Sequence, residues 1–223
     1  MTEEKPELGT RLNDVAAVIA KGSLGAVPFV GALLAEVAGG LIPHQRLDRL
    51  VDFSKLLEAQ VERLSIEHAE LRRRFSSPEF VDVVEEGLRQ AARALSDSRR
   101  AAIANLLANG LNEAQLDHAR MRKLLMILDA ITDEEIVWLR FASLQGTKDA
   151  DAFFEVHRAI LEPVIADSST DRDSHQRESL QEASRQALVL HRLLRPSEDP
   201  SHLTWLGDLL LEFISEPGAQ EPE

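Results

Sequence analysis

Helical spacing is the feature of this sequence that most restricts its fold. Apolar residues recur at steps of three and four in the ranges 50–75, 80–95 and 116–128, and this spacing is typical of one face of an α-helix. Nearly all other signals in the 223 residues are helical too. The sequence therefore predicts an all-α fold with a helical bundle over residues 1–131.

Capping signals set the expected ends of the first helices. One long amphipathic helix is expected from about Arg46 to Phe75. Ser77 and Pro78 then follow as the N-cap and first residue of a second helix, because a serine hydroxyl accepts an orphan amide and proline fits the first turn. These two helices are expected to pack against each other.

Two further bundle helices follow in the sequence. Asp97 is expected to cap the third, which is expected to end at Asn109 and Gly110, a pair typical of a left-handed C-cap. Asn112 and Gln115 resemble a capping box that opens the fourth helix. Together with the first two helices, these would complete the bundle.

The C-terminal third has shorter predicted helices. Thr132 and Glu135 form a capping-box pair that opens a helix closed by Gly146. Further helices are expected over residues 150–161 and 178–194, and a last one follows in SHLTWLGDLLLEFI. The order of a T-D-E-E first helix, two further helices and an L-T-x-L-G turn before the last helix resembles a winged-helix domain. The resemblance implies a compact winged-helix-like unit over residues 132–215. We also expect a disordered tail over residues 216–223.

Charge is unevenly distributed along the chain, whose formal net charge is −13. Residues 132–215 hold 16 acidic and 8 basic residues, whereas residues 1–131 are nearly balanced with 19 acidic and 17 basic residues. An acidic surface repels phosphate backbones, so we expect no nucleic-acid binding. An acidic winged-helix-like unit would serve protein contact or packing rather than DNA reading.

The sequence carries no pattern that indicates enzyme chemistry. It has no cysteine, and none of its seven histidines stands in an H-x-x-x-H or E-x-x-H pattern, so we expect no metal site. The segment KGSLG at residues 21–25 lacks the order of a phosphate-binding loop. We therefore predict a protein that is not an enzyme, with no catalytic residue, no cofactor and no evident small-molecule substrate.

Residues 15–43, VAAVIAKGSLGAVPFVGALLAEVAGGLIP, form an apolar stretch unlike the rest of the chain. It contains five of the eleven glycines and only two charged residues, Lys21 and Glu36. Its length matches a membrane span, but the glycines and Pro28 divide it into two apolar pieces, each too short to cross a hydrocarbon core of about 30 Å. The sequence thus predicts a helical hairpin or a broken helix here.

The second of these pieces presents a face suited to close helix contact. Gly31, Ala35 and Gly39 are four residues apart, a small-residue spacing that lets another helix approach closely. A neighbouring apolar stripe consists of Val27, Val30, Leu34, Val37 and Leu41. The hairpin could be the central element of the bundle, or a membrane-active and oligomerising element that is released from it.

Three consecutive cations, Arg72, Arg73 and Arg74, close the first amphipathic segment. Cations at a helix C-terminus are favoured by the helix dipole, by some tenths of a kcal/mol each. The same cluster could contact lipid headgroups or an acidic partner. Both interpretations stay open at this point.

A family resemblance follows from the order of these segments. A glycine-rich apolar N-terminus, long amphipathic helices, SDSRRAAIANLLANGLNEAQ and LLMILDAITDEEIVWLRFAS resemble small helical proteins of bacterial defence and abortive infection, and HeLo-type cell-death bundles. The resemblance covers about the first 145 residues. It implies an N-terminal element that perturbs a membrane after a trigger.

Two functions of different classes follow from the sequence. The first is a membrane-associating effector, acting through residues 15–43 as a homo-oligomer or with a protein partner, in the cytoplasm and at the periphery of the inner membrane. The alternative is a soluble adaptor whose acidic C-terminal unit binds a protein partner. A transcriptional regulator is a weaker third interpretation.

Overall fold

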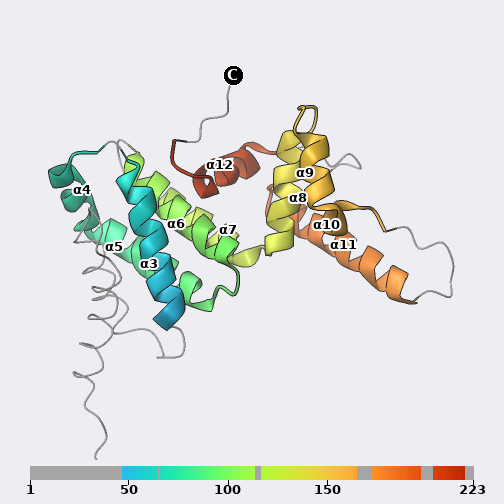
Figure 1. Ribbon diagram of the computed structural model, residues 1–223, viewed down its shortest axis with the longest axis horizontal. Coiled ribbons are helices and arrows are strands. Elements are labelled where there is room, and N and C mark those ends of the chain that lie inside the picture. The colour runs from blue at the N-terminus through green and yellow to red at the C-terminus, as the bar shows by residue number, and fades with distance from the viewer. Residues whose placement is uncertain (1–46, 65, 114–116, 165–171, 197–202, 219–223) are drawn as a thin grey trace, which may run out of the picture. The chain divides into compact units, whose positions relative to one another are not determined.

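The structure is a computed structural model that describes residues 47–64, 66–113, 117–164, 172–196 and 203–218. The described residues are helical and contain no β-strand, which confirms the predicted all-α fold. The helices are shown in Figure 1, and their bounds are α3 (Leu47–Glu62), α4 (His68–Phe75), α5 (Pro78–Arg93), α6 (Asp97–Asn112), α7 (His118–Ala130), α8 (Asp133–Leu144), α9 (Ala150–Val156), α10 (Arg158–Leu161), α11 (Arg172–Leu190) and α12 (Trp205–Ile214).

The chain divides into two compact units. The first comprises residues 1–126 and 213–223, and the second comprises residues 127–212. The sequence placed the boundary after residue 131 and assigned residues up to 215 to the C-terminal unit. In the structure the last residues of α12 belong instead to the first unit.

The core of the first unit is built around α6. Ten of its sixteen residues are buried, so this helix is covered on every face, as expected for the central helix of a bundle. Helices α3 and α5 pack against α6 and against each other, as Figure 1 shows. The largest fully buried side chains of this core include Phe53 and Leu57 from α3, Phe80 and Leu88 from α5, and Ile103, Leu106 and Leu107 from α6 itself.

The end of α12 is bound to α6 by two asparagines one turn apart. Asn105 Nδ2 donates to the carbonyl oxygen of Ile214 at 2.9 Å. Asn109 Nδ2 donates to the carbonyl oxygens of Phe213 and Ser215 at 2.9 and 3.0 Å. These side chains satisfy carbonyl groups that a helix end leaves without intrahelical partners.

An ion pair extends this attachment into the predicted tail. Arg63 Nη1 lies 2.6 Å from Glu216 Oε2. Residue 216 is thus placed in the structure, and the disorder expected over 216–223 stays a prediction for residues 219–223, which lie outside the described ranges.

The prediction of one helix from Arg46 to Phe75 is wrong. Helix α3 ends at Glu62, and α4 begins after Glu67, whose backbone is extended. A straight continuation would carry Phe75 about 20 Å beyond Glu62. Phe75, at the end of α4, packs against Phe80 in the first turn of α5, with ring centroids 5.0 Å apart in an edge-on arrangement.

The predicted ends of α6 also differ from the structure. Its N-cap is Ser96, whose hydroxyl accepts the amide of Arg99 at 3.1 Å, and Asp97 is the first helical residue. Gly110 lies inside the helix rather than at a left-handed C-cap. A Cβ atom at this position would overlap the side chain of Met121. The glycine is therefore explained by the close approach of α7.

The predicted N-caps of α5 and α8 are confirmed, and that of α7 is not. Ser77 caps α5, and Thr132 and Glu135 form the complete capping box of α8. Asn112 lies in α6, and Asp117 accepts the amide of Arg120 at 3.0 Å in the first turn of α7. The C-terminal signal at Gly146 is confirmed by its φ of +81°.

In the second unit, α8 contacts α9, α10 and α11. The helix expected over 150–161 is interrupted at His157 into α9 and α10. Helix α11 begins six residues before its predicted start and ends at Leu190. In place of a wing, the described residues contain an isolated β-bridge between Leu194 and Leu203. The winged-helix-like architecture is therefore not confirmed.

Candidate functional site

Trp205, the first residue of α12, is the most exposed large apolar side chain in the described ranges. Its exposed fraction is 86%, whereas the chain's other tryptophan, Trp138, is buried in α8. Tryptophan is usually covered in folded proteins and is enriched where proteins bind partners. An exposed tryptophan on an ordered helix thus marks a candidate contact site.

The backbone that carries Trp205 is held by its neighbour Thr204. The amide of Thr204 donates to the carbonyl oxygen of Leu193 at 3.0 Å. Its hydroxyl lies 2.6 Å from the carbonyl oxygen of Arg192 and 3.0 Å from that of Leu193, and it accepts the amide of Gly207 at 3.0 Å. Thr204 is therefore both the N-cap of α12 and its attachment to the segment after α11.

Gly207 explains how this attachment is so close. A Cβ atom at Gly207 would overlap the carbonyl oxygen of Leu193, which is a backbone atom and cannot turn aside. The inner face of α12 continues from this contact through the buried residues Leu210 and Ile214. The residue type at position 207 thus fixes the start of α12 against residue 193.

The outer face of α12 combines an aromatic ring with two carboxylates. Asp208 and Glu212 are exposed and follow Trp205 by three and seven residues, a spacing that places all three on one helix face. We call Trp205, Asp208 and Glu212 the α12 face. An indole beside carboxylates suits a cation, because the ring attracts it through its π-electrons and the carboxylates through charge.

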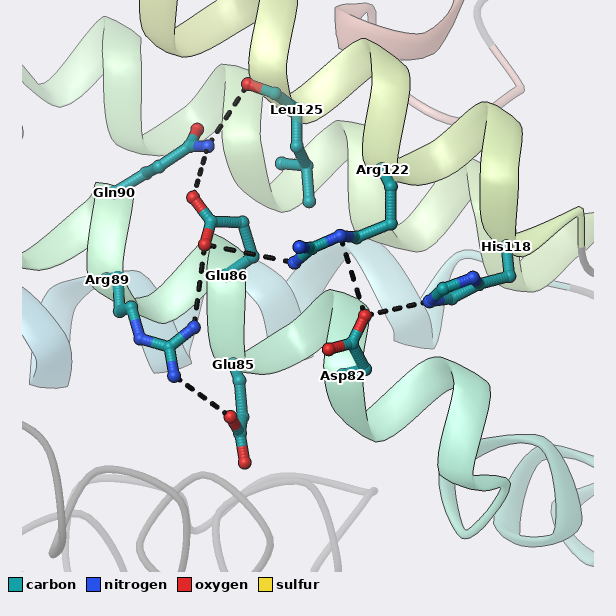
Figure 2. Close-up of polar contacts among 8 residues, drawn as sticks. All are labelled: Asp82, Glu85, Glu86, Arg89, Gln90, His118, Arg122 and Leu125. Carbon is teal, nitrogen blue, oxygen red and sulfur yellow. Dashed lines mark hydrogen bonds and ion pairs between the residues drawn. The ribbon is translucent and has the colours of Figure 1, made fainter.

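A second polar group, shown in Figure 2, joins α5 to α7. His118 Nε2 lies 2.7 Å from Asp82 Oδ2. Arg122 lies 3.5 Å from the same carboxylate oxygen and 3.9 Å from Glu86 Oε2. Gln90 Nε2 donates to Glu86 at 3.0 Å and to the carbonyl oxygen of Leu125 at 3.1 Å.

The chemistry of this second group is that of an attachment between helices. A histidine beside an aspartate can act as a catalytic base only when a nucleophile or a substrate proton is within reach. The half-buried ion pairs and the glutamine bridge account for the contact of α7 with α5, so we assign this group a structural role.

The three consecutive arginines are separated by their contacts. Arg74 Nη1 donates to the carbonyl oxygens of Leu111 and Glu113 at 2.5 and 2.6 Å, and thereby caps the end of α6. Arg73 is largely exposed and pairs with Glu70 at 2.5 Å. Arg72 is exposed. Arg74 therefore has a structural role, and lipid or partner contact by the triplet stays a prediction.

The main sequence-predicted site lies outside the described residues. It comprises Val27, Val30, Gly31, Leu34, Ala35, Val37, Gly39 and Leu41. Within the described ranges, no helix is long and apolar enough to cross a membrane. The same ranges hold no group of three or more histidine, aspartate or glutamate side chains placed to bind a metal ion.

Sequence reasoning missed the α12 face, although a signal for it exists. The last helix has apolar residues or glycine at 207, 210, 211 and 214, and Trp205 falls with Asp208 and Glu212 on the opposite side. A helical projection would have separated the tryptophan from the apolar face. Comparisons with protein families, with curated proteins and with solved structures find no match to this chain.

Proposed function

We propose that this protein is a non-enzymatic interaction protein whose second unit binds a basic segment of a protein partner through the α12 face. The observation that carries the proposal is the 86% exposure of Trp205 beside Asp208 and Glu212. A cation stacked on an indole is stabilised by about 0.5–2 kcal/mol. Tryptophan is also enriched among the few residues that dominate the energy of protein interfaces.

The charge of the surrounding chain supports a basic partner. Residues 132–215 carry twice as many acidic as basic residues, 16 against 8. Such a surface attracts a basic segment over several ångströms and repels nucleic acid and anionic lipid. Binding to a basic partner is therefore expected to weaken as salt is added.

Tryptophan fluorescence of the full-length protein provides the test. A library of short arginine- or lysine-containing peptides is titrated against the protein, with matched glutamate-containing peptides as the comparison. Because Trp138 is buried and Trp205 is exposed, binding at the α12 face should shift the emission of Trp205. Trp205→Ala lacks this reporter, so its binding is measured by calorimetry, and it should bind a basic peptide about tenfold or more weakly, as expected for a central interface tryptophan.

Two control variants give this test its specificity. Trp205→Phe retains a ring for stacking but removes the emission of Trp205, so its peptide binding is also measured by calorimetry. Its affinity should fall less than that of Trp205→Ala. Leu95→Ala changes another highly exposed residue in the first unit and should leave binding unchanged. Equal binding by wild type and Trp205→Ala, or equal binding of basic and acidic peptides, contradicts the proposal.

A second candidate function rests on residues 15–43. We propose that this segment associates with membranes, which would place the protein at the periphery of the inner membrane in a role in bacterial defence. The segment has only two charged residues in 29, which supports the idea. An all-apolar hairpin would be a simple core element if it lay at the centre of the bundle. Helix α6 already occupies the centre of the described bundle, and this further supports a membrane role for residues 15–43.

Vesicle flotation and dye leakage test this second function. The full-length protein is compared with a variant lacking residues 15–43 and with the double variant Gly31→Leu, Gly39→Leu. We expect the deletion to abolish flotation and the double variant to retain lipid binding but lose crosslinked oligomers, because leucine prevents close helix approach. Full-length protein that neither floats nor causes leakage under oligomerising conditions contradicts the proposal.

A further inference from the structure

Helix α11 carries an exposed apolar stripe on one of its faces. Leu180 and Leu190 are 69% and 78% exposed. Ala183 is exposed and Ala187 is half-buried between them. We call these four residues the α11 stripe. Its members lie on one face of the helix because they are spaced by three, four and three residues.

The attachment of α11 to its own unit uses another face. Leu188 is the buried residue of this 19-residue helix. Gln181 donates to the carbonyl oxygens of Ile160 and Glu162 at 3.2 and 2.8 Å and accepts the amide of Val164 at 3.1 Å. Helix α11 is thus anchored through one face, while the α11 stripe on another face stays uncovered. Figure 1 shows the N-terminal turns of α11 extending beyond α8, α9 and α10.

We infer that the α11 stripe binds the α11 stripe of a second copy of this chain in an antiparallel pair. The spacing of three, four and three reads the same in both directions. A two-fold axis between residues 183 and 187 therefore places each leucine of one copy opposite a leucine of the other, and each alanine opposite an alanine. A two-fold symmetric interface requires this self-complementarity, and the small central residues let the two helices approach closely.

A shallow, open hollow on α11 lies where this pairing would place a side chain of the second copy. The hollow is lined by Arg172, His175, Gln176, Ser179 and Leu180. In paired helices a side chain from one helix enters a hole formed by four residues of the other. These residues stand at positions i−4, i−1, i and i+3, where i is the residue opposite the inserted side chain. For Leu190 of the second copy these are residues 176, 179, 180 and 183, and three of them line the hollow.

The charges of α11 also permit association with a second copy. The helix holds three acidic and three basic residues, Asp173, Glu178, Glu182, Arg172, Arg177 and Arg185, although its unit is acidic. Glu182 is paired with Arg185 on the helix itself. Two copies can therefore meet along α11 without the net repulsion that the acidic surface would otherwise produce.

The stripe is narrow, so the dimer is expected to depend on concentration. Stable interfaces usually bury about 800 Å² on each partner, and two leucines and two alanines cover less. The full-length chain should shift from its monomer mass of 24.8 kDa toward twice that value as concentration rises in sedimentation analysis. This inference goes beyond the α12 face and does not depend on it.

Engineered cysteines test the antiparallel arrangement, since the natural chain has none. The variants Ala183→Cys and Ala187→Cys are oxidised separately and as an equal mixture. Because a disulfide needs Cα atoms within about 7 Å, the mixture should form disulfide dimers about tenfold faster than either variant alone. Faster crosslinking of Ala183→Cys alone would overturn the antiparallel arrangement, and equal rates with a monomer mass at all concentrations would overturn the inference.

A matched pair of leucine variants keeps the test independent of folding. Leu180→Glu with Leu190→Glu should abolish the concentration-dependent dimer, and both positions are exposed enough to leave helicity unchanged in circular dichroism. Leu95→Glu, at a leucine that is 84% exposed in the first unit, should dimerise as the wild type does. Persistence of the dimer in the double variant would overturn the inference. The double variant should still bind peptide at the α12 face.

Discussion

Helices α6 and α11 have similar lengths and neither shows a clear apolar stripe facing a core, yet they have opposite surroundings. In α6, ten of sixteen residues are buried, whereas α11 buries Leu188 alone among its nineteen residues. A helix with no distinct apolar face toward a core is either covered on all sides or exposed on most of them. The comparison teaches that periodicity alone cannot tell a core helix from a surface helix.

Composition separates the two helices where periodicity does not. The central part of α6, AAIANLLANGL, consists of small and aliphatic residues with two asparagines, and these asparagines bind the main chain at the end of α12. Helix α11 contains six charged residues that cannot be buried without cost. Its attachment depends on Leu188 and on the hydrogen bonds of Gln181.

The largest expected effect is removal of a core side chain from α6. Leu107→Ala should destabilise the protein by about 2–5 kcal/mol, because it leaves a cavity among fully buried residues. Leu180→Ala on α11 should change stability by less than about 0.5 kcal/mol, because little area is lost from the folded state. Urea unfolding followed by far-ultraviolet circular dichroism measures both values. Similar midpoints for the two variants would break the comparison.

Glycine substitutions come next and compare the tightest contacts in the two units. Gly207→Ala should cost about 1–3 kcal/mol, because the new methyl group meets the backbone of Leu193. Gly110→Ala should cost less, because the side chain of Met121 can move and alanine favours a helix by about 0.5–1 kcal/mol. Thermal unfolding ranks the two variants. A larger loss for Gly110→Ala would show that Met121 is held rigidly.

Side chains that bind main-chain groups of another element are expected to have intermediate effects. Arg74→Ala removes the hydrogen bonds to the end of α6 and should cost about 1–3 kcal/mol. Gln181→Ala removes the corresponding attachment of α11, so amide exchange should rise in α11 more than elsewhere in the second unit. Arg73→Ala is the control for Arg74, because its side chain is 77% exposed. A loss of stability in Arg73→Ala equal to that in Arg74→Ala would contradict the capping role.

The smallest effect is expected from surface carboxylates at low pH. Hydrogen bonds from Arg74 and then Arg73 lower the pKa of Glu70, and a hydrogen bond from Gln186 and the charge of Arg185 lower the pKa of Glu182. Because each folded-state pKa lies below the ordinary value of 4.5, the contribution to stability is present above that pH and is lost as pH falls through the folded pKa. Glu70→Gln and Glu182→Gln should each reduce the loss of stability between neutral and acid pH. An unchanged pH profile would contradict both pKa shifts.

Much of the fold followed from the sequence because capping signals act locally. Ser77, Thr132 with Glu135, and Gly146 have the roles that their types and spacing predicted. The predictions failed where a distant contact decided the local structure. The interior position of Gly110, for example, depends on the close approach of Met121 in α7.

The candidate sites were harder to predict for the same physical reason. An exposed tryptophan and a buried one look alike in a sequence, and the exposure of Trp205 follows from which face of α12 is covered. The role of Arg74 depends on carbonyl groups near residue 111 that its neighbours in sequence do not reveal. The face around Gly31 and Gly39 lies outside the described residues and stays a prediction.

The two asparagines that hold the end of α12 have a consequence for the order in which the chain can fold during synthesis. The hydrogen bond from Asn105 to Ile214 joins residues 109 positions apart. Synthesis adds about 5–20 residues per second, so α6 is made several seconds before its final partner exists. During that interval Asn105 and Asn109 lack the carbonyl groups of residues 213–215 to which they donate in the finished fold. The first unit can therefore begin to fold before the second unit has been made. It cannot finish folding until residues 213–215 have been added.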